Sequence, residues 1–188
     1  MPHPDSTVMN KIRAFFSKSS ILAIQILSDL HLEVSQQYSS FMIPASALYL
    51  VLASDVGRLI DYESYLAFLA KQTAQFEQVF LVLGNHEFYG LSFLSGLDRA
   101  RKLENEAGLN GKLVLLHQRR FNIPNFDIII LGCTLWSAVP EDAREVAQTK
   151  VKDFKKIEGW TVDNHNASHE ADLTWLRHPV QISGGRTF

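Results

Sequence analysis

Three short, mostly apolar runs in the first half of the chain each end in a polar cluster. The runs are residues 21–27, 49–53 and 79–83, and the clusters are Ser28-Asp29-Leu30-His31, Ser54-Asp55 and Gly84-Asn85-His86-Glu87. Short runs that are apolar at nearly every position are typical of strands covered on both faces. The pattern therefore predicts parallel strands of an α/β sheet.

Helical periodicity follows the second and third runs. Residues 62–76 carry an apolar stripe, which predicts a helix lying on the sheet and, with its flanking strands, a βαβ unit. A second helix is predicted over residues 92–107, ending before Gly108. The stripe of the first helix consists of Tyr62, Tyr65, Leu66, Leu69 and Phe76, and that of the second of Leu94, Leu97, Ala100, Leu103 and Ala107.

The later part of the chain has a different pattern. Short strands are predicted at residues 112–116, 121–123 and 127–132, and the chain is mostly polar after Trp136. One more helix is predicted over residues 164–176, with a buried side formed by Ala171, Trp175 and Leu176, and a strand is expected to start at residues 180–182. We expect one partial domain over residues 21–182, a flexible N-terminal extension over residues 1–20, and an irregular tail over residues 183–188.

Composition narrows the class of protein. The 188 residues include 18 Lys+Arg and 20 Asp+Glu, so no excess of positive charge indicates binding to nucleic acid. Cys133 is the single cysteine, which excludes an intramolecular disulfide and favours a reducing, cytoplasmic location. The apolar runs are far shorter than the roughly 18 residues of a membrane span, so we expect no membrane association through a helix.

The polar clusters at the predicted strand ends carry the candidate chemistry. Ligands in open α/β sheets collect beyond the carboxyl ends of the strands, where Asp29, His31, Asp55 and Asn85 are expected. Asp29 and His31 are two residues apart, so they can offer an oxygen and an imidazole to one cation. His86 can act as a proton donor near neutral pH. Each residue alone could be an ordinary turn residue, but the combination indicates a site for divalent metal.

The clusters also resemble a known family. Asp29-Leu30-His31, Ser54-Asp55 and Gly84-Asn85-His86-Glu87, about thirty residues apart and in this order, are similar to the first three motifs of the calcineurin-like metallophosphoesterases. The resemblance covers about residues 21–176. It implies an α/β fold built as an α/β/β/α sandwich, and a hydrolase that acts on a phosphomonoester or phosphodiester.

The resemblance also implies roles for individual residues. Asp29 and His31 would hold the first of two divalent ions (Mn, Fe or Zn), Asp55 would bridge both ions, and Asn85 would hold the second. His86 would protonate the leaving alkoxide, and a metal-activated hydroxide would attack the phosphoester.

The sequence departs from this family in two respects. Ser54 stands where the family usually has glycine, so a positive φ there would cost about 1 kcal/mol in backbone strain. The Gly-His and Gly-His-x-His motifs that complete the metal sites are absent. We therefore expect a truncated form with an incomplete second sheet, one weakly bound ion, reduced activity and an exposed sheet edge that favours oligomers.

Three further histidines lie outside these motifs. His165 and His169, four residues apart, are interpreted as solvent-facing residues of the last helix, and His117 follows a strand near the cleft.

Three functions stay open: a metallophosphoesterase, a non-catalytic binding or regulatory module of the same fold, and a nucleotide-binding α/β domain. The third is disfavoured because no glycine-rich phosphate loop is present.

Overall fold

A four-stranded parallel sheet forms the centre of the molecule. The computed structural model describes residues 22–182, and the expected extension (residues 1–20) and tail (183–188) lie outside them. The strands are adjacent in chain order β1-β2-β3-β4, and each neighbouring pair is parallel. Their bounds are Ile24–Leu27, Tyr49–Ala53, Gln78–Val82 and Leu113–Leu115. The predicted parallel strands of an α/β sheet are confirmed.

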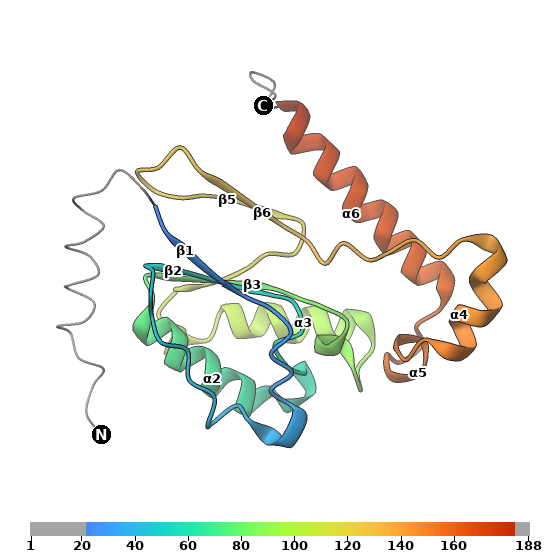
Figure 1. Cartoon of the computed structure of the whole chain (residues 1–188), viewed down its shortest axis with the longest axis horizontal. Coiled ribbons are helices and arrows are strands. Elements are labelled where there is room, and N and C mark those ends of the chain that lie inside the picture. The colour runs from blue at the N-terminus through green and yellow to red at the C-terminus, as the bar shows by residue number, and fades with distance from the viewer. Residues whose placement is uncertain (1–21, 183–188) are drawn as a thin grey trace.

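Two helices cover one face of this sheet (Figure 1). Helix α2 (Tyr62–Gln75) buries Tyr65, Phe68 and Leu69, and α3 (Phe93–Glu104) buries Leu97, Ala100 and Leu103. The Ser92 side chain accepts a hydrogen bond from the backbone N–H of Ser95 and so caps α3. Both predicted helices are confirmed, although α3 ends three residues before the expected position.

A two-stranded antiparallel sheet lies over the opposite face (Figure 1). Its strands are β5 (Arg119–Asn122) and β6 (Ile129–Gly132). Phe121 packs edge-on against Phe80 of β3, with 4.9 Å between ring centroids. The cover does not extend over β1, where Ile26 is 66% exposed. The expectation that all three strands are covered on both faces is therefore wrong for β1, which is an edge strand.

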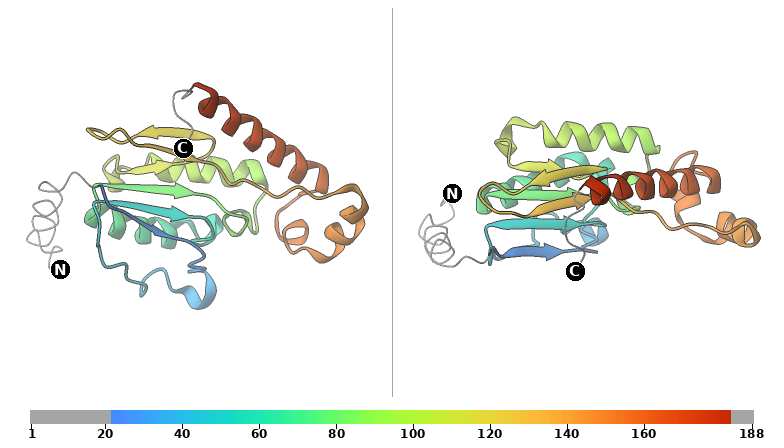
Figure 2. Two further views of the ribbon diagram at one scale, coloured as in Figure 1. Left: turned by 45° about the horizontal axis from the view of Figure 1, so that its top comes forward. Right: turned by 90° about the horizontal axis from the view of Figure 1, so that it is seen from above.

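Three further helices lie beyond the carboxyl ends of the strands (Figure 2). They are α4 (Arg144–Lys150), α5 (Asp153–Lys156) and α6 (Val162–Ile182). Because α6 continues to Ile182, the strand expected at residues 180–182 is wrong. Short 3-10 helices occupy the connections at Val34–Gln36, Leu59–Asp61, His86–Phe88, Ala107–Leu109 and Glu141–Ala143.

The buried side of α6 differs from the prediction. Ala171 is exposed, whereas His165 and Asp172 are buried. These two residues are seven positions apart and share a helix face, and polar contacts hold this face against the segment after β6. The apolar periodicity therefore indicated the helix but not its orientation. Within residues 22–182, no helix combines the length and apolar character needed to cross a membrane.

Candidate metal centre

The turns that follow β1 and β2 are joined by backbone hydrogen bonds. The N–H of Asp29 donates to the Ser54 carbonyl at 3.1 Å, and the N–H of His31 donates to the Asp55 carbonyl at 3.0 Å. All four residues have positive φ, from 47° at His31 to 80° at Ser54. Strained backbone of this kind gathers at functional sites. The strain expected at Ser54 is therefore present, shared with its neighbours.

One group of possible metal ligands forms at these turns. Asp29, His31 and Asp55 each offer one ligand atom, and these atoms lie within 4.8 Å of one another. Asp29 is exposed and the other two are half-buried. Two carboxylates and an imidazole are a donor set that suits a divalent transition metal. The structure thus brings together three of the residues that the sequence indicated.

His86 joins the centre through its backbone and its ring. Its N–H donates to Asp55 Oδ1 at 3.0 Å, and its Nδ1 lies 2.8 Å from Glu33 Oε1 and 3.2 Å from His31 Nδ1. An ionised carboxylate can only accept, so a proton on His86 Nδ1 satisfies the contact with Glu33. His31, Glu33 and His86 also form a second group of possible ligands that shares His31 with the first.

Sequence reasoning missed Glu33. It follows His31 by two residues, as His31 follows Asp29, so the alternating pattern Asp-Leu-His-Leu-Glu offered a signal that could have found it. One of its oxygens, Oε2, is buried and has no hydrogen-bond partner among the described residues.

The last residue of the third motif, Glu87, ties the turns after β2 and β3 together. Its fully buried carboxylate accepts from the N–H of Gly84 at 2.7 Å and of Val56 at 2.8 Å. The N–H of Asp55, the N–H of Gly57 and the hydroxyl of Tyr65 donate to it as well, at 3.1 to 3.2 Å. Burial raises the pKa of Glu87 to about 7, against the lowering effect of the hydrogen bonds from Gly84, Gly57 and Val56. Glu87 therefore holds Asp55 in place.

Gly84 is required by the close approach of these turns. A Cβ atom at this position would lie 2.0 Å from Ser54 Oγ and 2.2 Å from Asp55 Oδ1. Contacts this short do not occur, so any side chain at residue 84 would displace Asp55.

Asn85 is oriented by residues outside the three motifs. Its Nδ2 donates to Asp153 Oδ1 at 2.7 Å and to the Tyr89 hydroxyl at 2.9 Å. The Tyr89 hydroxyl donates in turn to Asp153 Oδ1 at 2.7 Å. Burial and the neighbouring Asp153 raise the pKa of Tyr89, which keeps the phenol protonated. Sequence reasoning missed Asp153, because nothing in a polar stretch 68 residues away points to Asn85.

A pocket of about 240 Å³ opens beside Asn85. Its wall combines the strand-end residues Ser54, Gly84 and Asn85 with Asp153, His165 and the segment at residues 134–137. The wall is rich in hydroxyl, amide and imidazole groups, so the pocket suits a polar molecule.

Three further histidines, His117, His165 and His169, each contact a neighbouring group, although the Nδ1 atoms of His117 and His165 are buried without a hydrogen-bond partner among the described residues. His165 is 5% exposed and its Nε2 lies 3.4 Å from Ser137 Oγ, so the interpretation as a solvent-facing residue is wrong for it. His169 contacts the Trp136 carbonyl through Nδ1, and His117 packs edge-on against Phe93. Burial lowers the pKa of both His117 and His165. Neither these two nor His169 belongs to a ligand group found within the described residues.

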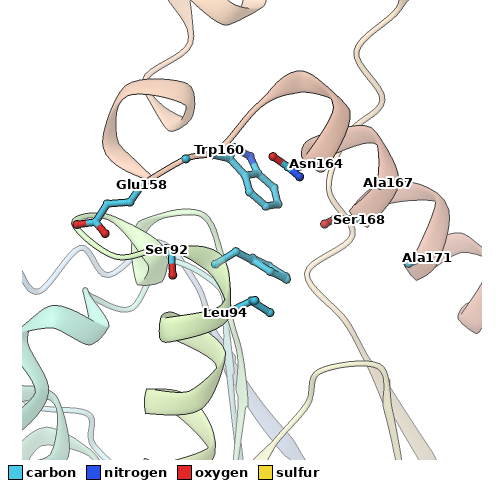
Figure 3. A pocket seen from close by; sticks show the side chains of 10 residues that line it. Ser92, Leu94, Glu158, Trp160, Asn164, Ala167, Ser168 and Ala171 are labelled. Atoms are coloured by element: carbon cyan, nitrogen blue, oxygen red, sulfur yellow. The ribbon is translucent and has the colours of Figure 1, made fainter.

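A second, larger hollow of about 470 Å³ lies between the start of α3 and α6 (Figure 3). Trp160, Phe93 and Ala171 give it a mainly apolar wall. Glu158 is the acidic residue of this wall. Neither group of possible metal ligands found among the described residues includes a residue of this hollow. The hollow is therefore separate from the candidate metal centre.

Comparison with known proteins supports the fold. No protein-family model matches the chain. An uncharacterized protein of Acanthamoeba polyphaga mimivirus, L509, is 27% identical over 180 residues, which cover 85% of this chain and 63% of the viral protein. The crystal structure of phosphopantetheinyl hydrolase from Mycobacterium tuberculosis superposes with a TM-score of 0.57 at 17% identity, over 84% of this chain and 62% of that one.

These comparisons define a mixed α/β fold shared with a hydrolase. The chain spans less than two thirds of the length of either protein. At 17% identity the likeness shows a similar arrangement of the backbone, and it assigns no chemistry to the residues of this chain.

Proposed function

We propose that the chain is a metal-dependent phosphoesterase that hydrolyses a phosphomonoester or phosphodiester. The observation that carries the proposal is the convergence of Asp29, His31 and Asp55 at the carboxyl ends of neighbouring parallel strands, with ligand atoms within 4.8 Å of one another. Such an edge is where α/β sheets bind their ligands. The resemblance to the calcineurin-like metallophosphoesterases gives the same three residues the role of metal ligands.

The chain's own residues suit the individual tasks. Asp29, His31 and Asp55 would hold one ion, and the carbonyl oxygen of Asn85 would serve a second position next to Asp55. Divalent ions bound there would supply an acidified water as nucleophile and positive charge opposite the phosphate. His86, held at Nδ1 by Glu33, would donate a proton from Nε2 to the leaving alkoxide.

The second position has fewer ligands than the first. No group of possible ligands within the described residues contains His117, His165 or His169, so the second position is left with Asp55 and Asn85 and without an imidazole. We therefore propose that one ion, of Mn, Fe or Zn, is bound weakly at the first position of this chain, that the second position fills only at higher ion concentration, and that turnover is reduced. The fold would be an α/β/β/α sandwich in which β5 and β6 are part of the second sheet.

The proposal extends to the substrate class, the cellular location and the self-association of the chain. The substrate would be a phosphoester, and a phosphopantetheinyl ester, the group named in the mycobacterial hydrolase, belongs to that class. The single half-buried thiol of Cys133 favours a reducing, cytoplasmic location. The exposed Ile26 on edge strand β1 would favour self-association.

Metal binding and turnover test the proposal together. Metal-free protein is titrated with Mn²⁺ by calorimetry, and hydrolysis of nitrophenyl phosphate and bis-nitrophenyl phosphate is followed with and without the ion. We expect at least one bound equivalent and ion-dependent hydrolysis, with both lost in Asp55→Asn. The control is Asp98→Asn, because the Asp98 side chain is 75% exposed on α3. Absence of ion binding, or an Asp55→Asn protein with unchanged binding, contradicts the proposal.

The alternative is a non-catalytic binding or regulatory module of the same fold. The observation that favours it is the lack of an imidazole at the second position within the described residues. Binding of one ion that depends on Asp55, without hydrolysis of either ester, would support this alternative.

A further inference from the structure

The amide of Asn85 can in principle be presented in two ways, and the two differ in chemistry. One places its carbonyl oxygen toward a metal, which oxygen can bind, and the other places its NH₂ there, which cannot bind a cation. At a position with as few ligands as the second one, this choice decides whether an ion is held at all.

The neighbours of Asn85 select one of the two. Asp153 Oδ1 lies 2.7 Å from the amide nitrogen. An ionised carboxylate has no proton to donate, so the amide atom facing it must be the NH₂ group. The Tyr89 hydroxyl, at 2.9 Å, accepts from the same nitrogen and donates its own proton to Asp153. The three polar groups therefore form a closed set of hydrogen bonds with one consistent direction.

Burial makes this set rigid. Asp153 is 9% exposed and Tyr89 is 5% exposed, so water competes little with their hydrogen bonds. Asp153 opens helix α5, in which Phe154 packs against the main core, and Ile157, the residue after the helix, belongs to that core. The hydrogen bonds of the Asn85 side chain to other described residues are made by its NH₂ group, and none is made by its carbonyl oxygen. It is therefore free to serve as a ligand.

We propose that Asp153, with Tyr89, is a positioning residue that fixes the amide of Asn85 with its carbonyl oxygen toward the second metal position. The proposal rests on the phosphoesterase function proposed above. It adds a residue outside the three motifs to the site, and it gives a chemical role to the polar stretch after β6. Groups that orient a ligand in this way commonly change metal affinity 10- to 100-fold when they are removed.

Two substitutions at residue 153 separate positioning from other roles. Asp153→Asn keeps a carbonyl oxygen that can accept from Asn85, but it removes the charge. Asp153→Leu has a similar volume and removes the acceptor. If Asp153 positions Asn85, the Asn variant stays close to the wild type and the Leu variant does not. If Asp153 acts by its charge, both variants fail alike.

The first measurement needs no metal. The side-chain NH₂ of Asn85 is followed in ¹⁵N correlation spectra of the full chain and is assigned through its loss in Asn85→Asp. We expect slow hydrogen exchange of this NH₂ in the wild type and in Asp153→Asn, and exchange at least 10-fold faster in Asp153→Leu. Equal exchange in the wild type and the Leu variant overturns the proposal.

The second measurement titrates Mn²⁺ by calorimetry. We expect the weaker binding step to lose at least 10-fold in affinity in Asp153→Leu and less than about 3-fold in Asp153→Asn, with the stronger step unchanged. Asp142→Leu, at an exposed position in the 3-10 helix before α4, is the matched control. Identical titrations of the wild type and the Leu variant, or an Asn variant as weak as the Leu variant, overturn the proposal.

Failure of folding and failure of the function remain distinguishable. Should Asp153→Leu not fold, Tyr89→Phe serves in its place, since it removes one acceptor of the Asn85 NH₂ and keeps the ring; unchanged exchange and affinity in that variant overturn the proposal. A wild type that binds no ion but protects the Asn85 NH₂ overturns the phosphoesterase function, and the metal role of Asp153 with it.

Discussion

Two regions of the molecule are stabilised in different ways. The sheet region, residues 22–132, holds most of the buried apolar side chains, among them Phe68, Phe76 and Phe80, which are completely buried. The strand-end region, residues 133–182, contributes three buried residues to the main core cluster as described: Trp136, Ile157 and Trp160. Helix α4 in this region has no buried residue at all.

Specific polar contacts hold the strand-end region in place. Asp172 accepts from Gln118 Nε2 at 2.9 Å and from the N–H of Leu135 at 2.8 Å. Asn166 accepts from the N–H of Val139 at 2.8 Å and donates to its carbonyl at 2.9 Å. A contact between neutral groups, such as those of Asn166, contributes about 1 kcal/mol, and a contact with the carboxylate of Asp172 contributes about 1.5–3 kcal/mol, similar to the burial of one large apolar side chain.

The two regions contribute different parts of the candidate site. The sheet region supplies the three motifs and a rigid edge, whereas the strand-end region places Asp153 and His165 next to Asn85. Regions with few buried apolar contacts open at lower free energy than the core. The pocket beside Asn85 would therefore be shaped by the less stable of the two regions.

The largest effect is expected from a change in the sheet region. Phe80 is completely buried and contacts Tyr49 and Phe121. Phe80→Ala should lower the free energy of unfolding by about 3–5 kcal/mol, because it leaves a large cavity between the two sheets. Urea unfolding followed by circular dichroism measures the loss. Phe126→Ala, at a 37% exposed position in the β5–β6 turn, is the control and should cost far less. Equal losses of unfolding free energy in the two variants would contradict the role of Phe80 in the core between the two sheets.

The sheet region was also the more predictable of the two. The run at residues 49–53 gave the bounds of β2 without error, and the helix predicted from residue 92 begins at Phe93. Apolar periodicity of this kind is the signal that a sequence carries locally. The three polar motifs of the sheet region could be found for the same reason, since each one directly follows an apolar run.

The strand-end region carried much less of that signal. Helices α4 and α5 were not predicted, because α4 has no buried face and α5 has four residues. The orientation of α6 depends on Asp172 and His165, whose partners lie far away in the sequence. Asp153 could not be assigned to the site, because its contact with Asn85 exists only in the folded chain.

A second prediction concerns the polar contacts themselves. Asp172→Leu should destabilise the strand-end region by about 1–3 kcal/mol, because it leaves the N–H of Leu135 and the amide of Gln118 without their acceptor. Hydrogen exchange should rise at residues 133–139 and in α6 and stay unchanged in β2 and β3. Asp127→Leu, at an exposed position, is the control. A uniform rise over the whole chain would contradict two regions of different stability.

Acid should loosen the strand-end region through His165. Burial lowers the pKa of His165 below its usual value near 6.5, against the raising effect of Asp153. The unfolded chain therefore takes up the proton first, so the stability from neutral His165 is complete above about pH 6.5 and is lost as the pH falls toward the folded pKa. Melting temperatures between pH 7.5 and 5.5 should fall less steeply in His165→Gln than in the wild type. Equal slopes would exclude His165 as the titrating group.

The smallest effect is expected at the junction of the two regions, and it is a gain. Ser54 has a φ of 80°, a conformation that costs a residue with a Cβ atom about 1 kcal/mol and glycine almost nothing. Ser54→Gly should raise the free energy of unfolding by up to about 1 kcal/mol, reduced by the greater freedom of glycine in the unfolded chain. Mn²⁺ affinity should stay unchanged, because Glu87 holds the N–H of Asp55. Ser54→Ala keeps the Cβ atom and should bring no gain in urea unfolding; a Gly variant no more stable than the Ala variant would show that the turn stores no strain.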